Sequence, residues 1–470
     1  MPPLHSVSSL RQPMATRLAL LLAVAGALAG CTSYEADPVR PLEILRELDA
    51  LRIEDVTQAE VAPILTSFDA SDGLSLLEAS AIAVRRNPTL AALRARVGVA
   101  EARLIQAGLL SDPVIGWSAG DPLADLIIEG KVDGASWLTG ASLSWQVPRP
   151  GEIDAKEGAA KARIRVNGAQ LARAEWALVR EVHLAYARLL VAQARLAQNE
   201  RLSGIAQQTL KYFARARAAG AATALDEALA RVAANTVQAN LLSAKSQRTL
   251  ARQNLNGLLG LSPDREWNLQ DSLSRFVPQA PSEDLKQLVS ESLERRPDLQ
   301  EIVASYEQAE ERLRLEVAGQ WPQLQIGTGI SISLPIFSRF NQPAIETALR
   351  SRTAARLRVR AAVQQTRREI HAALTRAEQA YVLLDLFRTS LGPQSEETLK
   401  LTEKAFKARE VTPLQILTAQ RQVLDTQSRF LAAQQAWAEA RIRLDSACGR
   451  LLPSARTPLP PTSESEEESK

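Results

Sequence analysis

The chain has 470 residues, with 56 lysines and arginines against 53 aspartates and glutamates, which gives a formal charge of +3 at pH 7. This near-neutral mixture of charges argues against nucleic-acid binding, which needs a basic patch or stripe. Aromatic residues make up 4% of the chain and there are two cysteines, which argues against a compact core of large side chains and against a disulfide framework.

Residues 1–30 have the organisation of a signal peptide. Arg11 and Arg17 precede a short apolar run, and the small residues Ala29 and Gly30 come directly before Cys31. The apolar run is too short to cross a bilayer as an ordinary helix. Together with Leu28, the last three residues resemble a bacterial lipobox, so we predict that Cys31 carries the lipid anchor, with enough acyl chains for stable attachment. Lipoproteins that stay at the inner membrane usually have aspartate after the lipidated cysteine. Thr32 follows Cys31 here, so sorting to the outer membrane is favoured. The alternative is a plain signal peptide that ends near a cysteine.

Residues 31–73 contain three prolines and short apolar clusters, so we expect an irregular segment. The first of two repeats, 74–262, begins with a helix that is interrupted near Asn87-Pro88. A β-hairpin over 112–150 follows, because the period changes from helical to alternating.

Apolar residues alternate with small or polar residues from Trp137 to Val147, and Trp137 and Trp145 lie near the two ends of the apolar face. This pattern is typical of a transmembrane β-strand with interfacial aromatic residues, and Trp117 lies on the partner strand. A half-buried hairpin of a soluble protein is the alternative interpretation.

The stretch 151–262 contains no proline and is rich in alanine, leucine, glutamine and arginine. Its apolar residues recur every three or four positions, which is typical of helices packed lengthwise against partners. Gly220 followed by Thr223 marks the end of one helix and the start of the next. We therefore predict one long antiparallel helical hairpin.

A linker over 263–283 separates this repeat from a second one over 284–450, and an acidic tail over 451–470 is expected to be disordered. Pro88 matches Pro297 at an offset of 209. Further on, His183 matches His371 at 188, and the closing glycines match at 189. Such a long internal repeat implies two structurally equivalent halves. The second repeat is predicted to contain a helix, a short β segment over 322–337 and a long helical hairpin over 344–450.

The second β segment is the point at which the two halves differ most. Only 13 positions separate its prolines, Pro322 and Pro335, against 35 for Pro113 and Pro148. A single strand would place the flanking helices on opposite sides of a membrane. A turn at 327–329 would leave arms of about four residues, whereas spanning takes about 9–11. The sequence leaves both possibilities open.

The chain resembles the outer-membrane efflux proteins of the TolC family, in the lipid-anchored branch that includes outer components of metal and drug efflux. The resemblance covers about residues 74–450. The resemblance rests on four motifs. Two are corners at a proline, Asn87-Pro88-Thr89-Leu90 and Arg296-Pro297-Asp298-Leu299. The others are the end of a strand, Leu334-Pro335-Ile336-Phe337, and the start of a helix, Leu414-Gln415-Ile416-Leu417 up to Arg421. It implies a mainly α fold with a small β part, built from duplicated, coiled helical hairpins and membrane β-hairpins.

The resemblance further implies a homotrimer with an α-barrel and a β-barrel, in which each chain gives four strands to a twelve-stranded barrel in the outer membrane. The expected function is passive export of metal ions, drugs or other small molecules. The expected partners are outer-membrane lipids, a periplasmic adaptor and an inner-membrane pump; neither a cofactor nor nucleic acid is expected. The alternative function is a periplasmic structural lipoprotein that binds partners without forming a pore. An enzyme is disfavoured, because no nucleophile–base pair, phosphate loop or ligand cluster is present.

In such proteins the helical hairpin tips form the periplasmic entrance and contact the adaptor. Asp226 fits the acidic position of the family, whereas Gln415 and Thr418 stand where relatives carry aspartates. Thr223 and Asp226 can equally be helix caps. A metal ring formed by His183 and His371 is less favoured than a polar face between helices, and no metal site is predicted. The candidate tip residues are Ala219, Gly220, Ala221, Thr223, Leu225, Asp226, Glu410, Val411, Thr412, Pro413 and Leu414.

Overall fold

The computed structural model describes residues 34–53, 55–57, 61, 68, 72–117, 141–273, 276, 278–281, 284–327, 329–408 and 410–451. The chain forms two units, residues 1–50 and 51–470. The described part of the first unit contains the helix α2 (Pro41–Ala50), in which no residue is buried. This helix corrects the prediction of an irregular segment over 31–73 at residues 41–50. Proline is well tolerated in a first helical turn, and Glu43 lies at the positive end of the helix dipole.

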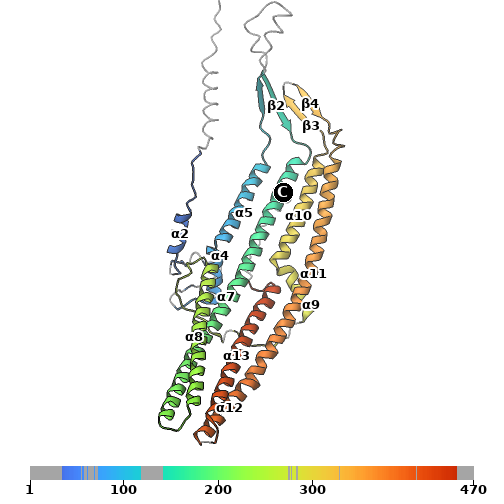
Figure 1. The fold of residues 1–470 in the computed structure, drawn as a ribbon. Coiled ribbons are helices and arrows are strands. Elements are labelled where there is room, and N and C mark those ends of the chain that lie inside the picture. Colours follow the sequence, from blue (N-terminus) through green and yellow to red (C-terminus); the bar gives the residue numbers. More distant parts are fainter. Residues whose placement is uncertain are drawn as a thin grey trace, which may run out of the picture. The chain divides into compact units, whose positions relative to one another are not determined.

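The second unit contains two equivalent series of elements, in which α11, η3 and α12 of the second together take the place of α7 in the first (Figure 1). The first series is α4 (Leu76–Arg86), α5 (Pro88–Ala107), β1 (Val114–Trp117), β2 (Ala141–Val147), α7 (Glu152–Ala218) and α8 (Ala224–Leu259). The second series is α9 (Leu285–Arg295), α10 (Pro297–Ala318), β3 (Gln323–Gly327), β4 (Ile330–Ser333), α11 (Gln342–Leu386), the π-helix η3 (Phe387–Leu391), α12 (Gly392–Lys407) and α13 (Pro413–Ala447). The predicted fold class, mainly helical with a small β part and an internal duplication, is confirmed.

Local sequence explains where the first helices begin and end. The Ser75 side chain accepts a hydrogen bond from the Glu78 backbone N–H, and the Glu78 carboxylate accepts one from the Ser75 N–H, which caps α4. Asn87 ends α4 and caps α5, since its Oδ1 accepts hydrogen bonds from the next two free N–H groups. Pro88 fits the first position of α5, where no N–H is needed.

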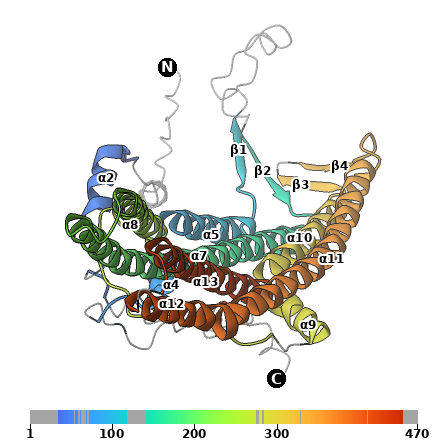
Figure 2. The same ribbon diagram turned by 60° about the horizontal axis from the view of Figure 1, so that its bottom comes forward.

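The four strands form one antiparallel sheet in the order β1-β2-β3-β4 (Figure 2). Strand β2 joins the two halves of the chain, because it pairs with β3 in a register that sets Trp145 opposite Ile326. Strands β3 and β4 pair with each other, with Ile326 opposite Ile330. Of the two possibilities for the second β segment, the hairpin is therefore correct and the single strand is wrong. Its arms are five and four residues long.

Equivalent positions of the two halves are buried in the same way. Val182 on α7 and Ile370 on α11, which differ by 188 in number, are both 0% exposed. Leu255 on α8 and Leu444 on α13, which differ by 189, are 0% and 1% exposed. Val182 and Leu255 lie in one hydrophobic cluster with residues of α4, and Ile370 and Leu444 lie in another with Leu288 of α9. The duplication is thus present in the packing of the helices as well as in their order.

Ion pairs connect α10 to the long helices beside it. Glu301 and Glu307 of α10 pair with Arg173 and Arg165 of α7 at 2.8 Å and 2.9 Å. On the other side, Glu310 pairs with Arg352 of α11 at 3.2 Å. Each half-exposed ion pair adds little to the free energy of unfolding, at most about 1 kcal/mol. Their effect is to set the register of α10 between two basic helices.

The π-helix η3 accounts for the change of offset from 188 to 189. The two tips are 189 positions apart, since α8 begins at Ala224 and α13 at Pro413, whereas the helix centres are 188 apart. The second half therefore has one extra residue between centre and tip. In η3 the Gly392 N–H bonds to the Phe387 carbonyl, five residues back instead of four, so one extra residue is absorbed in a wider turn.

Deleting Ser390 is therefore expected to remove the surplus residue without moving the tip. Because Pro393 has no N–H to donate, one helical hydrogen bond stays unmade, and the midpoint of thermal unfolding should change by at most about 2 °C. Deleting Glu200 from the equivalent stretch of α7 is the control, because α7 has no surplus residue. That deletion turns the rest of α7 by about 100° and should lower the midpoint by several degrees. Equal losses for both deletions would contradict this account of η3.

Two glycines close the two halves in the same conformation. Gly260 and Gly449 have φ of 74° and 70°, in the left-handed region, at the ends of α8 and α13. A Cβ at Gly260 would lie 3.1 Å from the Arg86 carbonyl oxygen, and one at Gly449 would lie 3.0 Å from the Arg295 Cβ. Arg86 and Arg295 are themselves equivalent residues at the ends of α4 and α9.

Alanine at either of these glycines is expected to lower the free energy of unfolding by about 1–2 kcal/mol, because a Cβ is strained in the left-handed region. Gly168, in the middle of α7, has no atom within 4 Å of its Cβ position. Alanine there should instead stabilise the protein by about 0.5–1 kcal/mol. Thermal unfolding of the three single variants checks both signs. A Gly260 variant as stable as the native protein would refute the prediction.

Candidate functional site: the hairpin tips and the helix junction

The first hairpin tip is a five-residue turn between α7 and α8. The Ala221 N–H donates to the Ala216 carbonyl at 2.8 Å, and Gly220 has φ of 69°, which together end α7 with a common glycine motif. Thr223 then caps α8. Its hydroxyl accepts from the Asp226 N–H at 3.1 Å, and Asp226 accepts from the Thr223 N–H and hydroxyl at 2.9 Å and 2.7 Å.

A buried carboxylate lies directly behind this tip. Glu227 has a side chain only 12% exposed, and it pairs with Arg217 of α7 at 2.7 Å and with Arg231 of α8 at 2.5 Å. These bonds lower the pKa of Glu227. At the equivalent position of the second hairpin stands Ile416, which is also buried. Behind the first tip there is thus a buried ion cluster, and at the equivalent position of the second hairpin there is a buried apolar side chain.

The capping role of Asp226 has a consequence for stability against pH. Its hydrogen bonds with the Thr223 side chain and N–H lower its pKa. A carboxyl group with a lowered folded-state pKa stabilises the protein above its unfolded pKa, near 4, and loses this effect as the pH falls through the lowered value. Asp226→Asn should therefore unfold at a lower temperature than the native protein at pH 6, and the difference should shrink at pH 3. Thermal unfolding at several pH values measures this difference, and one that does not depend on pH would contradict the prediction.

The second tip lies between α12 and α13. Thr412 caps α13 with Gln415, whose Oε1 accepts from the Thr412 N–H at 2.6 Å, and Pro413 occupies the first turn. The Glu410 N–H donates to the Ala405 carbonyl at 2.9 Å. Val411 and Leu414 lie in the turn and at the start of α13. Both sets of candidate tip residues therefore lie in tight, capped turns, and both tips lie at the same end of the second unit (Figure 1).

Trp117 and Trp145 are the other candidate residues within the described ranges, and both lie in strands. Trp117 is the last described residue of β1. Trp145 lies in β2, where its indole N–H donates to the Ser111 carbonyl at 2.9 Å. Trp137 and Cys31 lie outside the described residues, as does the acidic tail.

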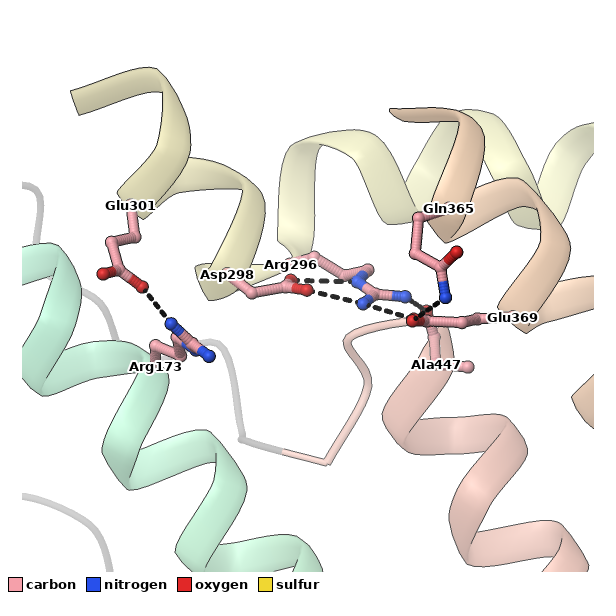
Figure 3. A network of polar contacts seen from close by, with 7 residues as sticks. All are labelled: Arg173, Arg296, Asp298, Glu301, Gln365, Glu369 and Ala447. Atoms are coloured by element: carbon pink, nitrogen blue, oxygen red, sulfur yellow. Dashed lines mark hydrogen bonds and ion pairs between the residues drawn. The ribbon is translucent and has the colours of Figure 1, made fainter. Parts of the chain in front are cut away.

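A junction forms where the start of α10 meets α11 and the end of α13. It contains a group that the sequence did not indicate, the guanidinium of Arg296 (Figure 3). Its side chain is 4% exposed. It donates twice to Asp298, at 2.9 Å and 2.6 Å, and once to Glu369 of α11 at 2.7 Å. A further bond of 3.3 Å reaches the carbonyl of Ala447, at the end of α13.

The guanidinium also stacks on an aromatic ring, and its neighbours keep it charged. It stacks over the ring of Trp176 on α7, 5.5 Å from the ring centre. Burial alone would lower the pKa of Arg296, but the hydrogen bond and charge of Asp298, together with those of Glu369, raise it. The side chain therefore stays charged and connects α7, α10, α11 and α13.

Asn87 makes the equivalent contact in the first half. Its Nδ2 donates to the Leu258 carbonyl at 3.4 Å, as Arg296 donates to that of Ala447. Leu258 and Ala447 differ by 189, and Asn87 and Arg296 by 209, so each N-terminal corner residue caps the C-terminal end of the equivalent helix. The arginine adds ion pairs that the asparagine lacks. The proline corners were found in the sequence, but nothing there indicated that Arg296 reaches Glu369, 73 residues further on.

The two histidines have different surroundings despite their equivalent positions. His183 is buried, and its Nε2 lies 3.1 Å from the Ser80 hydroxyl, whereas His371 is exposed on α11. Within the described ranges, no group of three or more histidine, cysteine, aspartate or glutamate residues could hold a metal ion. No helix among the described elements is both long and apolar enough to cross a bilayer.

Comparison with known proteins gives the following matches. The family model "Outer membrane efflux protein" matches residues 80–261 and 288–450. The cobalt-zinc-cadmium resistance protein CzcC of Cupriavidus metallidurans is 22% identical over 397 residues, which cover 81% of this chain and 91% of that protein.

Solved structures of bacterial outer membrane proteins have the same fold. The open state of the MtrE outer membrane channel of Neisseria gonorrhoeae matches with a TM-score of 0.67 and 20% identity, over 84% of this chain and 95% of that one. The outer membrane protein VceC of Vibrio cholerae matches with a TM-score of 0.63 and 18% identity, over 80% and 96%.

Proposed function

The chain belongs to the outer membrane efflux protein family, and we propose that it is the outer-membrane channel of a tripartite efflux system of the resistance-nodulation-division type. It passively conducts small solutes from the periplasm to the exterior and catalyses no reaction. A periplasmic adaptor and an inner-membrane pump are its partners. The observation that carries this proposal is the duplicated pair of long helical hairpins joined to a four-stranded sheet with two open edges.

The open sheet supports a homotrimer. Strands β1 and β4 are each paired on one side only within the described chain. Unpaired backbone groups are not tolerated in lipid, so edges that insert must pair with those of other copies. Three copies of four strands make the twelve-stranded barrel that the family resemblance implies.

The helices support the same arrangement. Val179, His183 and Ala187 form a face of α7 that is buried within the chain. The equivalent residues of α11 are Arg367, His371 and Thr375, all of which are exposed. Helix α11 thus lacks, on this face, the cover that its counterpart has, and a second copy supplies it. This face of α11 is polar, so the contact between copies relies on hydrogen bonds and shape.

One relative, CzcC, is a cobalt-zinc-cadmium resistance protein, which favours metal cations as the cargo. Drugs or other small molecules are the second candidate. Deletion of the gene should lower resistance to cobalt, zinc and cadmium, and the native gene should restore it. If only drug resistance falls, the cargo is of the second kind.

Channel formation itself is tested on the purified protein. Oligomers that survive detergent on gels and single-channel conductance in planar bilayers are expected. A monomer without conductance would overturn the proposal of a channel and favour the periplasmic structural lipoprotein.

Alanine at both Asp226 and Glu410 should change cation selectivity or blockade if the tips gate the entrance. Unchanged conductance and selectivity would leave Asp226 as a helix cap only.

We also propose that Cys31 is lipidated and anchors the protein at the outer membrane, as its resemblance to a lipobox implies. Cells given labelled palmitate should label the native protein and leave Cys31→Ser unlabelled. Equal labelling of the two would exclude this anchor.

A further inference from the structure

A stretch of nine residues recurs in similar but not identical form at the offset of 188. It reads Arg-Glu-Val-His-Leu-Ala-Tyr-Ala-Arg over 180–188 and Arg-Glu-Ile-His-Ala-Ala-Leu-Thr-Arg over 368–376. Both copies begin with Arg-Glu and end with arginine. The two arginines of each copy are eight residues apart, about 12 Å along the same side of a helix.

The two copies line one groove of about 700 Å³, which is built entirely from residues of one chain. Helix α7 supplies the first copy and α11 the second, and the end of α13 and the Arg296 junction also contribute to the lining. The lining residues with guanidinium groups are Arg180, Arg188, Arg296, Arg368, Arg376 and Arg443.

Carboxylates neutralise only part of this charge. Glu181 and Glu369 line the groove, and they pair with Arg180 and Arg296 respectively. Just behind the lining, Asp298 also pairs with Arg296, and Glu439 pairs with both Arg188 and Arg443. Six guanidinium groups thus face four carboxylates, which leaves two positive charges in excess.

The unused hydrogen-bond donors lie on the second copy of the repeat. Arg376 makes no ion pair or hydrogen bond with any described residue, and Arg368 donates a hydrogen bond to the neutral side chain of Gln365, at 2.6 Å. Each guanidinium has five N–H donors in a planar fork. The Trp176 side chain also lines the groove, and its buried indole N–H has no partner among the described atoms.

We propose that this groove binds a small multivalent oxyanion, that is, a phosphate or a polycarboxylate. Forked guanidinium donors match the oxygen pairs of these anions, and arginines on two facing helices can contact both ends of one anion. The lining of the groove comes from one chain, so anion binding can be measured separately from channel formation.

The test is calorimetric titration of the purified full-length protein in detergent with inorganic phosphate and, separately, with citrate. The groove variant is Arg368→Gln with Arg376→Gln, and a second variant carries Arg376→Gln alone. Because Arg376 has no ion-pair or hydrogen-bond partner within the described part of the chain, the single variant should fold as the native protein does. The matched control is Arg356→Gln with Arg360→Gln, two exposed arginines on α11 that do not line the groove.

The native protein and the control should bind at least one of the two anions with equal affinity, and both groove variants should bind it at least tenfold more weakly. Tighter binding of phosphate assigns the site to phosphates, and tighter binding of citrate assigns it to polycarboxylates. Absence of binding to the native protein overturns the proposal. Unchanged binding by the groove variants, or an equal loss in the control, also overturns it.

Discussion

Replacing Arg296 with alanine is expected to lower the free energy of unfolding by about 3 kcal/mol, because removal of one partner from a buried ion pair leaves the other charge uncompensated. The Arg296 side chain is 4% exposed and bonds to Asp298, Glu369 and the Ala447 carbonyl. All three acceptors lose a donor at once, and Trp176 loses the guanidinium that stacks over it.

Chemical denaturation, followed by circular dichroism, measures this loss. Arg350→Ala is the matched control, because Glu346 on the same helix is the one ion-pair partner of Arg350 among the residues that the structure describes, and the Arg350 side chain is 82% exposed. The control should change stability by at most about 0.5 kcal/mol. If the two variants lose the same stability, Arg296 does not hold the junction together.

Replacing Gly327 with alanine is expected to prevent pairing of β2 with β3 and to reduce the amount of assembled protein in the outer membrane at least tenfold. A Cβ at Gly327 would overlap the Leu143 carbonyl oxygen and lie 2.8 Å from the Ser144 Cα. Both of those atoms belong to the backbone of β2, which is the register partner of β3, so no side-chain movement can relieve the overlap.

The same turn provides the control. A Cβ at Gly329 has no atom within 4 Å, so Gly329→Ala should assemble as the native protein does. Membrane fractions analysed for oligomers that survive detergent give the readout, and the amount of soluble protein shows whether the chain is still made. Normal assembly of Gly327→Ala would mean that the contact between the two halves of the sheet is dispensable.

Features with a local or repeating signal could be predicted from the sequence. Absence of proline over 151–262 and apolar residues at helical spacing correctly indicated the long helices, and Gly220 with Thr223 correctly indicated the first tip. Matching positions of the two halves indicated the duplication. The capping role of Asp226 was also visible, because a threonine three residues before an aspartate forms a capping box.

Features that depend on contacts between distant residues could not be predicted. Arg296 reads in the sequence as a residue before a proline, and only the packing of α11 beside α10 brings Glu369 to it. The groove likewise arises because α7 and α11 face each other across the end of α13. Helix α2 was missed because the proline at its first turn was interpreted as a helix breaker rather than as a helix start.

The wide turn η3 has a mechanical consequence, because it is present in only one of the two hairpins. Helix α7 runs for 67 residues without such a turn, whereas the second hairpin has one between α11 and α12. We therefore expect the second hairpin to bend there more readily than α7 bends. Six hairpins surround the periplasmic mouth in the proposed trimer, and stiff and compliant ones alternate. In the proposed trimer we therefore expect dilation of that mouth to have threefold rather than sixfold symmetry.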